Sequence, residues 1–212
     1  MAGPLGDYLR DPEAIYRASF AAIRREAALE RVAPELRPLA VRLIHACGMT
    51  DIVGDLAWTA GAVAAGRRAL AAGAPVLVDA QMVAAGIQRE NLPAANRVIC
   101  TLGAGEVAGL ARDLGTTRSA AAVELWREHL PGAVVAIGTA PTALFRLLEV
   151  LLEGGPRPAL ILAFPVGFVG AAEAKEALIE HGALLEWVTL RGRRGGSALA
   201  AAAVNALLAE DP

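Results

Sequence analysis

Short, continuously apolar runs alternate along this chain with longer segments whose apolar residues recur at helical spacing. Runs that are apolar without alternation are typical of strands buried on both faces of a sheet. The repeated change from strand to helix predicts a layered α/β fold with a largely parallel sheet. We expect strands at Pro75–Asp79, Arg97–Leu102, Ala133–Ile137, Ala159–Ala163 and Leu185–Leu190. We expect helices near residues 60–72, 80–86, 105–113, 117–129, 140–152, 171–181 and 196–209.

Two further helices are predicted before the first strand. Asp11 can cap a helix that has Pro12 in its first position and runs to about Leu29. A second helix is expected over about Pro38–Cys47. The chain has 212 residues, a length that supports one substantial core and is short for two. We therefore expect a single domain over residues 1–212, an α/β/α arrangement with an N-terminal helical segment.

Composition narrows the choice of partners. Hydrophobic residues make up 55% of the chain and aromatic residues 4%, which fits close-packed helices over a sheet and argues against a disordered chain. The formal net charge is -2, so there is no overall positive field to hold nucleic acid. Any recognition of an anion must therefore be local.

The cysteines and the termini bear on the compartment. Cys47 and Cys100 offer no disulfide framework and fit a reducing environment. His45 and Cys47 lack the further spaced ligands that a zinc site requires, so we expect no metal in the protein itself. Residues 1–13 contain no apolar segment of the kind found in a secretory signal. Apolar stretches such as Pro158–Ala172 are interrupted and shorter than the ~20 residues that span a bilayer. A cytoplasmic protein without membrane contact is predicted.

The end of the second predicted helix carries the first candidate for proton chemistry. His45 is one of only three histidines, and histidine changes charge near neutral pH. With about 100° between successive residues, His45 lies roughly opposite the apolar stripe of its helix, and Arg42 lies beside it. The stripe consists of Leu36, Leu39, Ala40, Leu43 and Cys47. His45 should therefore face solvent, a partner chain or a ligand.

A solvated side chain is the simpler interpretation of His45, because polar residues on the outer face of a helix are usually exposed without a function. The functional interpretation involves Arg42. The like charge of Arg42 disfavours protonation of the imidazole, and an anionic ligand paired to Arg42 would remove that effect and so favour the protonated ring that a general acid needs. The other histidines, His129 and His181, resemble residues that close a helix C-terminus.

The loops that follow the predicted strands are rich in glycine or proline and lead into helices. In open α/β sheets ligands bind beyond the carboxyl ends of the strands, where glycine permits close approach and helix N-termini attract anions. Any single loop has an alternative explanation, since glycine often serves only the geometry of the turn. The loop Arg191–Ser197 is more specific, because it brings three arginines to a helix start. We select Gly167, Arg191 and Ser197 as candidate ligand-binding residues.

One loop permits a different function. Gly103–Ala108 follows a predicted strand, precedes a helix and matches a G-x-G-x-x-A dinucleotide fingerprint, with Glu124 about 20 residues further on. That pattern is typical of a nicotinamide or flavin oxidoreductase. However, Glu106 would point a carboxylate at the site of the pyrophosphate, and Glu124 lies within a predicted helix. The dinucleotide-dependent oxidoreductase is therefore kept as the alternative.

Seven segments, taken together, resemble the signature segments of a known family. They are Ser19-Phe20, Arg42–Gly48, Val98–Leu102, Thr117–Ala121, Ala140–Leu144, Pro165–Glu173 and Arg191–Ser197. In this order, over nearly the whole chain, they are similar to those of the precorrin-8X methylmutases. One residue departs from the pattern: Thr139 stands where asparagine is expected in G-N-A-P-T-A-L, and a hydroxyl cannot replace both functions of an amide.

The resemblance implies an isomerase of corrin-ring biosynthesis, on the route to cobalamin, that needs no cofactor. Family members move a methyl group from C11 to C12 of the macrocycle and convert precorrin-8X to hydrogenobyrinate, or act on the cobalt-containing counterpart. The residue that matches the family's acid is His45, and protonation near ring C would ease a 1,5-sigmatropic methyl shift. The resemblance also implies a homodimer and a tetrapyrrole substrate with several carboxylate arms. It assigns substrate contacts to Ser19, Arg42, Arg118, Asp79, Gln81 and Thr101.

Two questions stay open on the sequence alone. No residue must coordinate a metal, so the physiological substrate can be metal-free or can hold cobalt. A carrier that binds a tetrapyrrole without converting it is a third functional possibility beside the isomerase and the oxidoreductase.

Overall fold

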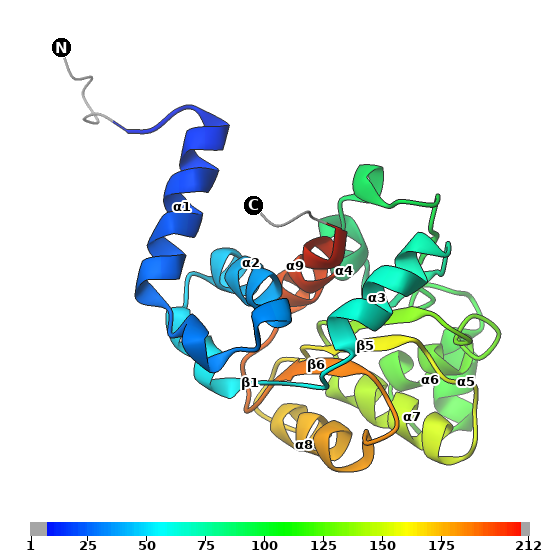
Figure 1. The fold of residues 1–212 in the computed structure, drawn as a ribbon. Coiled ribbons are helices and arrows are strands. Elements are labelled where there is room, and N and C mark those ends of the chain that lie inside the picture. The colour runs from blue at the N-terminus through cyan, green and yellow to red at the C-terminus, as the bar shows by residue number, and fades with distance from the viewer. Residues whose placement is uncertain (1–7, 209–212) are drawn as a thin grey trace.

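The computed structural model describes residues 8–208 and has a six-stranded sheet at its centre (Figure 1). The strand order is β1-β6-β5-β4-β2-β3. Only β1 runs antiparallel to its neighbour, β6, and the other pairs in this sheet are parallel. The strands are β1 Leu56–Trp58, β2 Val76–Val78, β3 Val98–Ile99, β4 Val134–Ile137, β5 Leu160–Ala163 and β6 Trp187–Leu190. The predicted layered α/β fold with a largely parallel sheet is confirmed.

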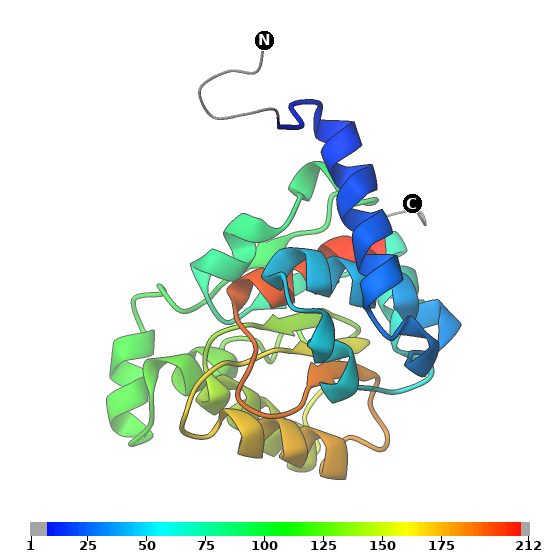
Figure 2. The same cartoon turned by 90° about the vertical axis from the view of Figure 1, so that its left-hand side faces the viewer.

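Helices cover both faces of the sheet, and the first helix projects from the body of the molecule beside α2 (Figures 1 and 2). The α-helices are α1 Pro12–Glu26, α2 Arg37–Cys47, α3 Ala62–Ala71, α4 Gln81–Gly86, α5 Val107–Asp113, α6 Arg118–Glu124, α7 Pro141–Leu152, α8 Ala171–His181 and α9 Ser197–Leu208. Short 3₁₀ turns are η1 Leu29–Arg31, η2 Pro34–Leu36, η3 Thr50–Asp55 and η4 Arg89–Asn91. Within residues 8–208, no helix has the length and apolar character needed to cross a membrane.

Alternate residues of the central strands point to opposite faces, and both faces are buried. On β4, Val134 and Ala136 pack in the cluster that includes α2, α3, α4 and α9. Val135 and Ile137 pack in the second cluster, against α7 and α8. In the parallel register, Val135 lies opposite Leu77 on one side and opposite another apolar residue of β5 on the other. Burial on both faces explains why these strands read as continuous apolar runs.

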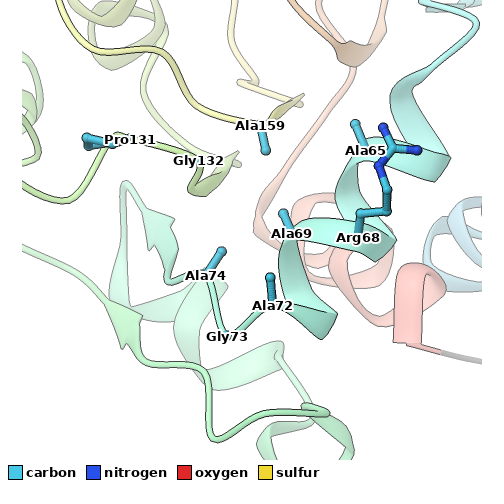
Figure 3. Close-up of a pocket in the computed structure, with 9 residues that line it drawn as sticks. All are labelled: Ala65, Arg68, Ala69, Ala72, Gly73, Ala74, Pro131, Gly132 and Ala159. Carbon is cyan, nitrogen blue, oxygen red and sulfur yellow. The ribbon is translucent and has the colours of Figure 1, made fainter.

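A hollow of about 640 Å³ opens at the amino-terminal edge of the sheet (Figure 3). Ala74, Gly132 and Ala159 line it, and they lie one or two positions before β2, β4 and β5. Its other wall is α3, with Arg68 as the charged residue. In parallel sheets ligands bind at the carboxyl ends of the strands, so this hollow lies at the edge opposite to the one where the sequence predicts a site.

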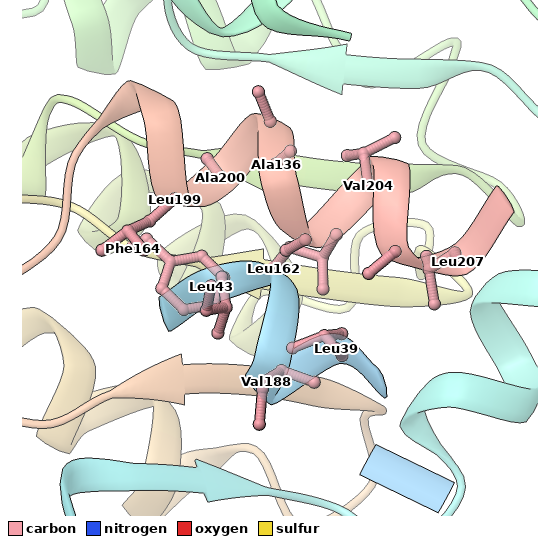
Figure 4. Close-up of a cluster of buried hydrophobic side chains, with 14 of the residues drawn as sticks. Leu39, Leu43, Ala136, Leu162, Phe164, Val188, Leu199, Ala200, Val204 and Leu207 are labelled. Atoms are coloured by element: carbon pink, nitrogen blue, oxygen red, sulfur yellow. The ribbon is translucent and has the colours of Figure 1, made fainter. Parts of the chain in front are cut away.

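Helix α2 packs against α9, and α9 packs against the sheet (Figure 4). Leu43 lies near Phe164 and Leu199, at the carboxyl end of β5 and the start of α9. All three side chains are at most 2% exposed, and full burial of a leucine or phenylalanine contributes about 1.5 to 3 kcal/mol of stability. This packing brings the C-terminal end of α2 to the carboxyl edge of the sheet.

Three elements differ from the sequence-based expectation. Helix α1 ends at Glu26, earlier than predicted, because Ala27 turns into the core with extended backbone, φ -86° and ψ 141°. Helix α6 ends at Glu124, and the chain continues in tight turns that bury Trp126. Strand β1, which pairs antiparallel with β6 at the edge of the sheet, was not predicted. In each case tertiary packing outweighs local propensity.

Candidate functional site

His45 lies in the last turn of α2, which ends where Gly48 adopts the left-handed conformation, with φ 71°. On the same helix Leu39 and Leu43 are buried, whereas His45 is exposed. The predicted orientation of His45, away from the core face of its own helix, is confirmed.

Helix α1 covers one side of the His45 ring. Ser19 Oγ lies 2.8 Å from His45 Nδ1, within hydrogen-bond distance. The Tyr16 ring stacks on the imidazole at 5.3 Å between centroids and 27° between planes. The Phe20 ring meets the imidazole edge-on, at 5.3 Å and 88°. These residues share one face of α1 because positions three and four apart lie side by side on a helix. Tyr16 was missed from the sequence, although its spacing from Ser19 was a usable signal.

The hydrogen bond with Ser19 gives the two ring nitrogens of His45 different roles. When the imidazole is protonated, both nitrogens are donors, so Nδ1–H donates to Ser19 Oγ and Nε2–H is left for a ligand. The serine fixes the tilt of the ring, and the two aromatic rings restrict its rotation. The arrangement suits an imidazolium that delivers a proton in one direction.

Arg42 lies next to this group of residues. Its guanidinium carbon is 5.7 Å from the centroid of the Phe20 ring, a distance typical of a cation–π contact. Its Nε is buried and has no hydrogen-bond partner among the described residues. A buried donor without a partner is costly, so an anionic group beside Arg42 would be stabilised. The predicted proximity of Arg42 and His45 agrees with this geometry.

The loops predicted to bind a ligand lie at the carboxyl edge of the sheet. The Gly167 amide donates to the Arg193 carbonyl at 3.2 Å, so the loop after β5 contacts the loop after β6. Ser197 is the first residue of α9, and α9 packs against α2, the helix of His45. The structure therefore brings His45 and two of the glycine-rich loops to one edge.

The three arginines of the Arg191–Ser197 loop have different surroundings. Arg191 pairs with Glu176 at 2.5 Å, and Arg194 pairs with two aspartates of η3. Arg193 lies over the ring of Phe168 at 5.0 Å and makes no ion pair with the described residues. Of the three arginines that the sequence places at this helix start, two are therefore already paired with carboxylates of the protein, and their contact with a ligand stays a prediction.

A second group of predicted residues lies at the ends of β2 and β3. Asp79 is 3% exposed and accepts hydrogen bonds from the backbone amides of residues 138, 139 and 140, at 2.8 to 2.9 Å. Burial raises the pKa of Asp79, and these hydrogen bonds oppose the rise. Thr101 Oγ1 donates to the Ala122 carbonyl at 2.8 Å. Both side chains therefore hold the fold together, and their contact with a substrate stays a prediction.

Arg118 and Gln81 are the more accessible members of this second group. Both side chains are exposed, Gln81 at the first position of α4 and Arg118 at the first position of α6. Arg118 also donates to the Leu102 carbonyl at 3.2 Å. Thr139, where the family pattern has asparagine, has a buried hydroxyl without a hydrogen-bond partner among the described residues.

Residues 8–208 contain no group of three or more His, Cys, Asp or Glu side chains placed to hold a metal ion. The dinucleotide-dependent alternative finds less support in the geometry. Glu124, the acidic residue of the dinucleotide pattern, ends α6 and pairs with Arg127 and Arg146. Although burial alone would raise it, the pKa of Glu124 is lowered by the hydrogen bonds from these arginines. A carboxylate engaged in this way does not suit recognition of a ribose.

Fold and site together define a class: an α/β protein with a largely parallel sheet and a histidine that contacts a serine hydroxyl and lies between two aromatic rings. Residues 14–210 match the sequence profile of the precorrin-8X methylmutase family, and the chain belongs to that family. The resemblance recognised in the sequence is confirmed, as is the class of enzyme it implies, an isomerase of cobalamin biosynthesis.

Relatives and solved structures agree with this assignment. The chain is 64% identical over 204 residues to a precorrin-8X methylmutase from Pseudomonas aeruginosa, covering 96% of this chain and 98% of the relative. It is 32% identical over 197 residues to a cobalt-precorrin-8 methylmutase from Priestia megaterium, covering 92% and 87%. The crystal structure of a precorrin-8X methylmutase from Thermus thermophilus superposes with a TM-score of 0.83 at 42% identity, covering 92% of this chain and 94% of that one.

Proposed function

We propose that this protein moves a methyl group from C11 to C12 of precorrin-8X and so produces hydrogenobyrinate, with His45 as the general acid. The observation that carries the proposal is the hydrogen bond between Ser19 and His45, within a frame formed by Tyr16 and Phe20. A frame that orients one imidazole toward a ligand is what proton delivery to a fixed position requires.

In the proposed reaction His45 supplies a proton to the substrate and takes a proton back at the end. His45 Nε2–H protonates the substrate near ring C, which withdraws electrons from the conjugated system and eases the 1,5-shift of the methyl group. The methyl group breaks its bond to C11 as it forms one to C12. Loss of a proton to His45 then restores the neutral macrocycle, so substrate and product are isomers and no other reactant is consumed.

The substrate's carboxylate arms account for the basic and glycine-rich surroundings. Arg42, with its unpartnered Nε, is the proposed contact nearest the acid. Arg118, Gln81, Gly167 and Ser197 are proposed contacts from the strand-end loops. Of the Arg191–Ser197 loop, Arg193 replaces Arg191 as the proposed carboxylate ligand, because Arg191 is engaged by Glu176.

We also infer that the physiological substrate is metal-free. The relatives named precorrin-8X methylmutase from Pseudomonas aeruginosa and Sinorhizobium sp are 64% and 54% identical to this chain. The relative from Priestia megaterium named for the cobalt substrate is 32% identical. Turnover of precorrin-8X should therefore exceed turnover of its cobalt counterpart, and the reverse ratio would refute the inference.

A homodimer in the cytoplasm is the proposed working form. Exposed apolar side chains along α1 and just before it support a second copy of the chain as partner, and among them Leu9 is 57% and Ile15 42% exposed. The unpaired thiols of Cys47 and Cys100 support a reducing compartment. Sedimentation of the purified protein tests the dimer, and a monomer at micromolar concentration would contradict it.

The three histidines of the chain provide a matched experiment. His45→Gln should lower turnover of precorrin-8X by about 100- to 10,000-fold, the usual contribution of a general acid. His129→Gln and His181→Gln, which alter the two other histidines, should retain turnover. The reaction is followed by the change in visible absorbance as the chromophore rearranges. Wild-type protein that binds precorrin-8X without converting it would be a carrier, and unchanged turnover in His45→Gln would refute the acid.

A further inference from the structure

Lys175 is the only lysine of the chain, and the remaining 19 of its 20 basic residues are arginines. It lies on α8 and is fully buried, with 0% of its surface exposed. Wherever a cation faces solvent, this chain uses arginine. The single lysine, at a buried position, indicates that this position requires a compact ammonium group with rotatable donors and does not accept a planar guanidinium.

The ammonium group holds the loop that follows β6. Lys175 Nζ donates a hydrogen bond of 2.7 Å to the carbonyl of Arg194. The guanidinium of Arg194 continues the chain of contacts, with donors 2.6 Å from Asp51 and 2.5 Å from Asp55 on η3. Since η3 follows directly after the end of α2, Lys175 is linked through this loop to the segment next to His45.

The same loop is fitted tightly against the loop after β5. The Gly196 amide donates to the Phe164 carbonyl at 2.8 Å. A Cβ at Gly195 would lie 2.3 Å from the same carbonyl oxygen, so only glycine allows this approach. The loop leads directly into Ser197 at the start of α9. A change in its shape would therefore alter the edge where the substrate's carboxylates are proposed to bind.

We propose that Lys175 is a positioning residue whose charged ammonium group holds the Arg191–Ser197 loop in its substrate-binding shape, so that substrate affinity depends on the charge of Lys175. The inference rests on the proposed function for the identity of the ligand. Its effect on the loop does not require any ligand.

The charges that act on Lys175 come from two elements, Asp55 on η3 and Glu176 on α8 itself. The contact with Arg194 is to its uncharged backbone carbonyl. Burial lowers the pKa of Lys175 to about 8, and the attraction of Asp55 and Glu176 opposes this effect. A charge-assisted hydrogen bond is about twice as strong as a neutral one. The contact with the loop should therefore weaken in mildly alkaline solution, where an ordinary lysine stays charged.

A protein with one lysine permits a direct measurement. Lysine labelled with ¹³C at Cε gives a single side-chain signal, which can be titrated in the wild-type protein without mutation. We expect a midpoint near 8, and saturation with hydrogenobyrinate should raise it, because a ligand that prefers the charged form favours protonation in return. A midpoint near 10.5, or one that does not move on saturation with hydrogenobyrinate, would overturn the proposal.

The loop can be observed in the absence of ligand. Amide exchange at Gly167 and Gly196, corrected for its intrinsic pH dependence, should accelerate as Lys175 loses its charge, while amides of β4 stay protected. Unchanged protection at these two glycines would overturn the proposal. Failure of hydrogenobyrinate to bind at pH 6.5 would instead count against the proposed function, and the exchange result would still decide the role of Lys175.

Three variants on α8 complete the test. Glu176→Gln removes one of the carboxylates that favour the ammonium, so the lysine midpoint and the pH at which the loop loses protection should move down together. Loss of the ion pair with Arg191 should in addition lower the protection of the loop at every pH. Glu180→Gln, an exposed glutamate on the same helix, is the matched control and should move neither. Lys175→Met should bind hydrogenobyrinate about 10-fold more weakly at pH 7, with no further loss up to pH 9. Loop protection that stays at its wild-type level in a folded Lys175→Met protein would contradict the proposal.

Discussion

Ser19 on α1 and His45 on α2 are 26 positions apart in the chain and lie 2.8 Å from each other, Oγ to Nδ1. The contact exists because α1 packs against α2 through Phe20 and Ile23, whose side chains are 5% and 7% exposed. The N-terminal helix is therefore part of the site, and its packing determines which nitrogen of His45 is left for the substrate.

Ser19→Ala should lower kcat by roughly 10- to 100-fold, because a misdirected imidazole loses much of the advantage of fixed geometry. The free energy of unfolding should change little, since the lost hydrogen bond contributes only about 1 kcal/mol. Steady-state kinetics and urea denaturation check these two expectations. Ser19→Thr retains the hydroxyl and should recover most of the activity; a threonine variant as slow as the alanine variant would show that the hydroxyl has no part in the effect.

Tyr16→Ala should reduce kcat by about 10-fold with little change in KM, because the stacked ring orients His45 without being needed for the fold. Tyr16 is 48% exposed, so the free energy of unfolding should stay within about 0.5 kcal/mol of the wild-type value. Tyr16→Phe keeps the aromatic ring and is the matched control. If the phenylalanine variant loses as much activity as the alanine variant, the phenol hydroxyl matters and stacking does not.

Asp79→Asn should destabilise the protein by about 1 to 3 kcal/mol at pH 7, because an amide cannot accept all three of the backbone hydrogen bonds that Asp79 receives. The sign of the pH dependence follows from the raised pKa of Asp79. The folded protein holds this proton more tightly than the unfolded chain does, so the wild type loses stability as the pH rises above 3.8. The asparagine variant has no such proton.

The difference in unfolding free energy between wild type and Asp79→Asn should therefore be widest at acidic pH and narrow as the pH rises. Urea denaturation of both proteins at several values from pH 5 to 7.5 measures it. A difference that widens with pH would mean that Asp79 is stabilised as a carboxylate, against the direction set by its burial.

The sequence predicted the fold better than it predicted the site. Continuous apolar runs located the strands of the parallel sheet because burial on both faces leaves a strong local signal. The exposed face of α2 was also predicted, since it depends only on helical periodicity. Helical spacing places Tyr16 and Phe20 on one face of α1 with Ser19, but their contact with His45 could not be predicted, because it depends on the angle at which two helices pack.

Asp79 illustrates a different limit. A carboxylate at the carboxyl end of a strand in an α/β fold is typical of a ligand contact. The sequence does not show that backbone amides in the loop after β4, the neighbouring strand in the sheet, donate hydrogen bonds to it. Arg191 and Arg194 are similar cases, since their partners, Glu176 and two aspartates of η3, lie far away in the chain. Which charged groups are already paired becomes known only when the topology is known.

As the pH rises and Lys175 loses its proton, the stability of the whole protein should increase, whereas its affinity for the substrate should decrease. In the folded state its pKa is about 8, below the ordinary value of 10.5. Between these pH values the unfolded chain binds more protons than the folded protein, so this group makes the free energy of unfolding rise with pH. The interval of about 2.5 pH units corresponds to roughly 3 kcal/mol in total.

The comparison with Lys175→Met isolates this contribution, because other titrating groups are common to both proteins and cancel. Relative to the methionine variant, the wild type should gain stability from pH 7 to 9.5, while its affinity for hydrogenobyrinate falls over the same range. Urea denaturation and absorbance titration measure the two quantities. If stability and affinity both declined with pH, alkaline pH would merely loosen the fold. Opposite trends would show two separate effects: the cost of burying the charged ammonium, and the stabilisation of the loop by its hydrogen bond.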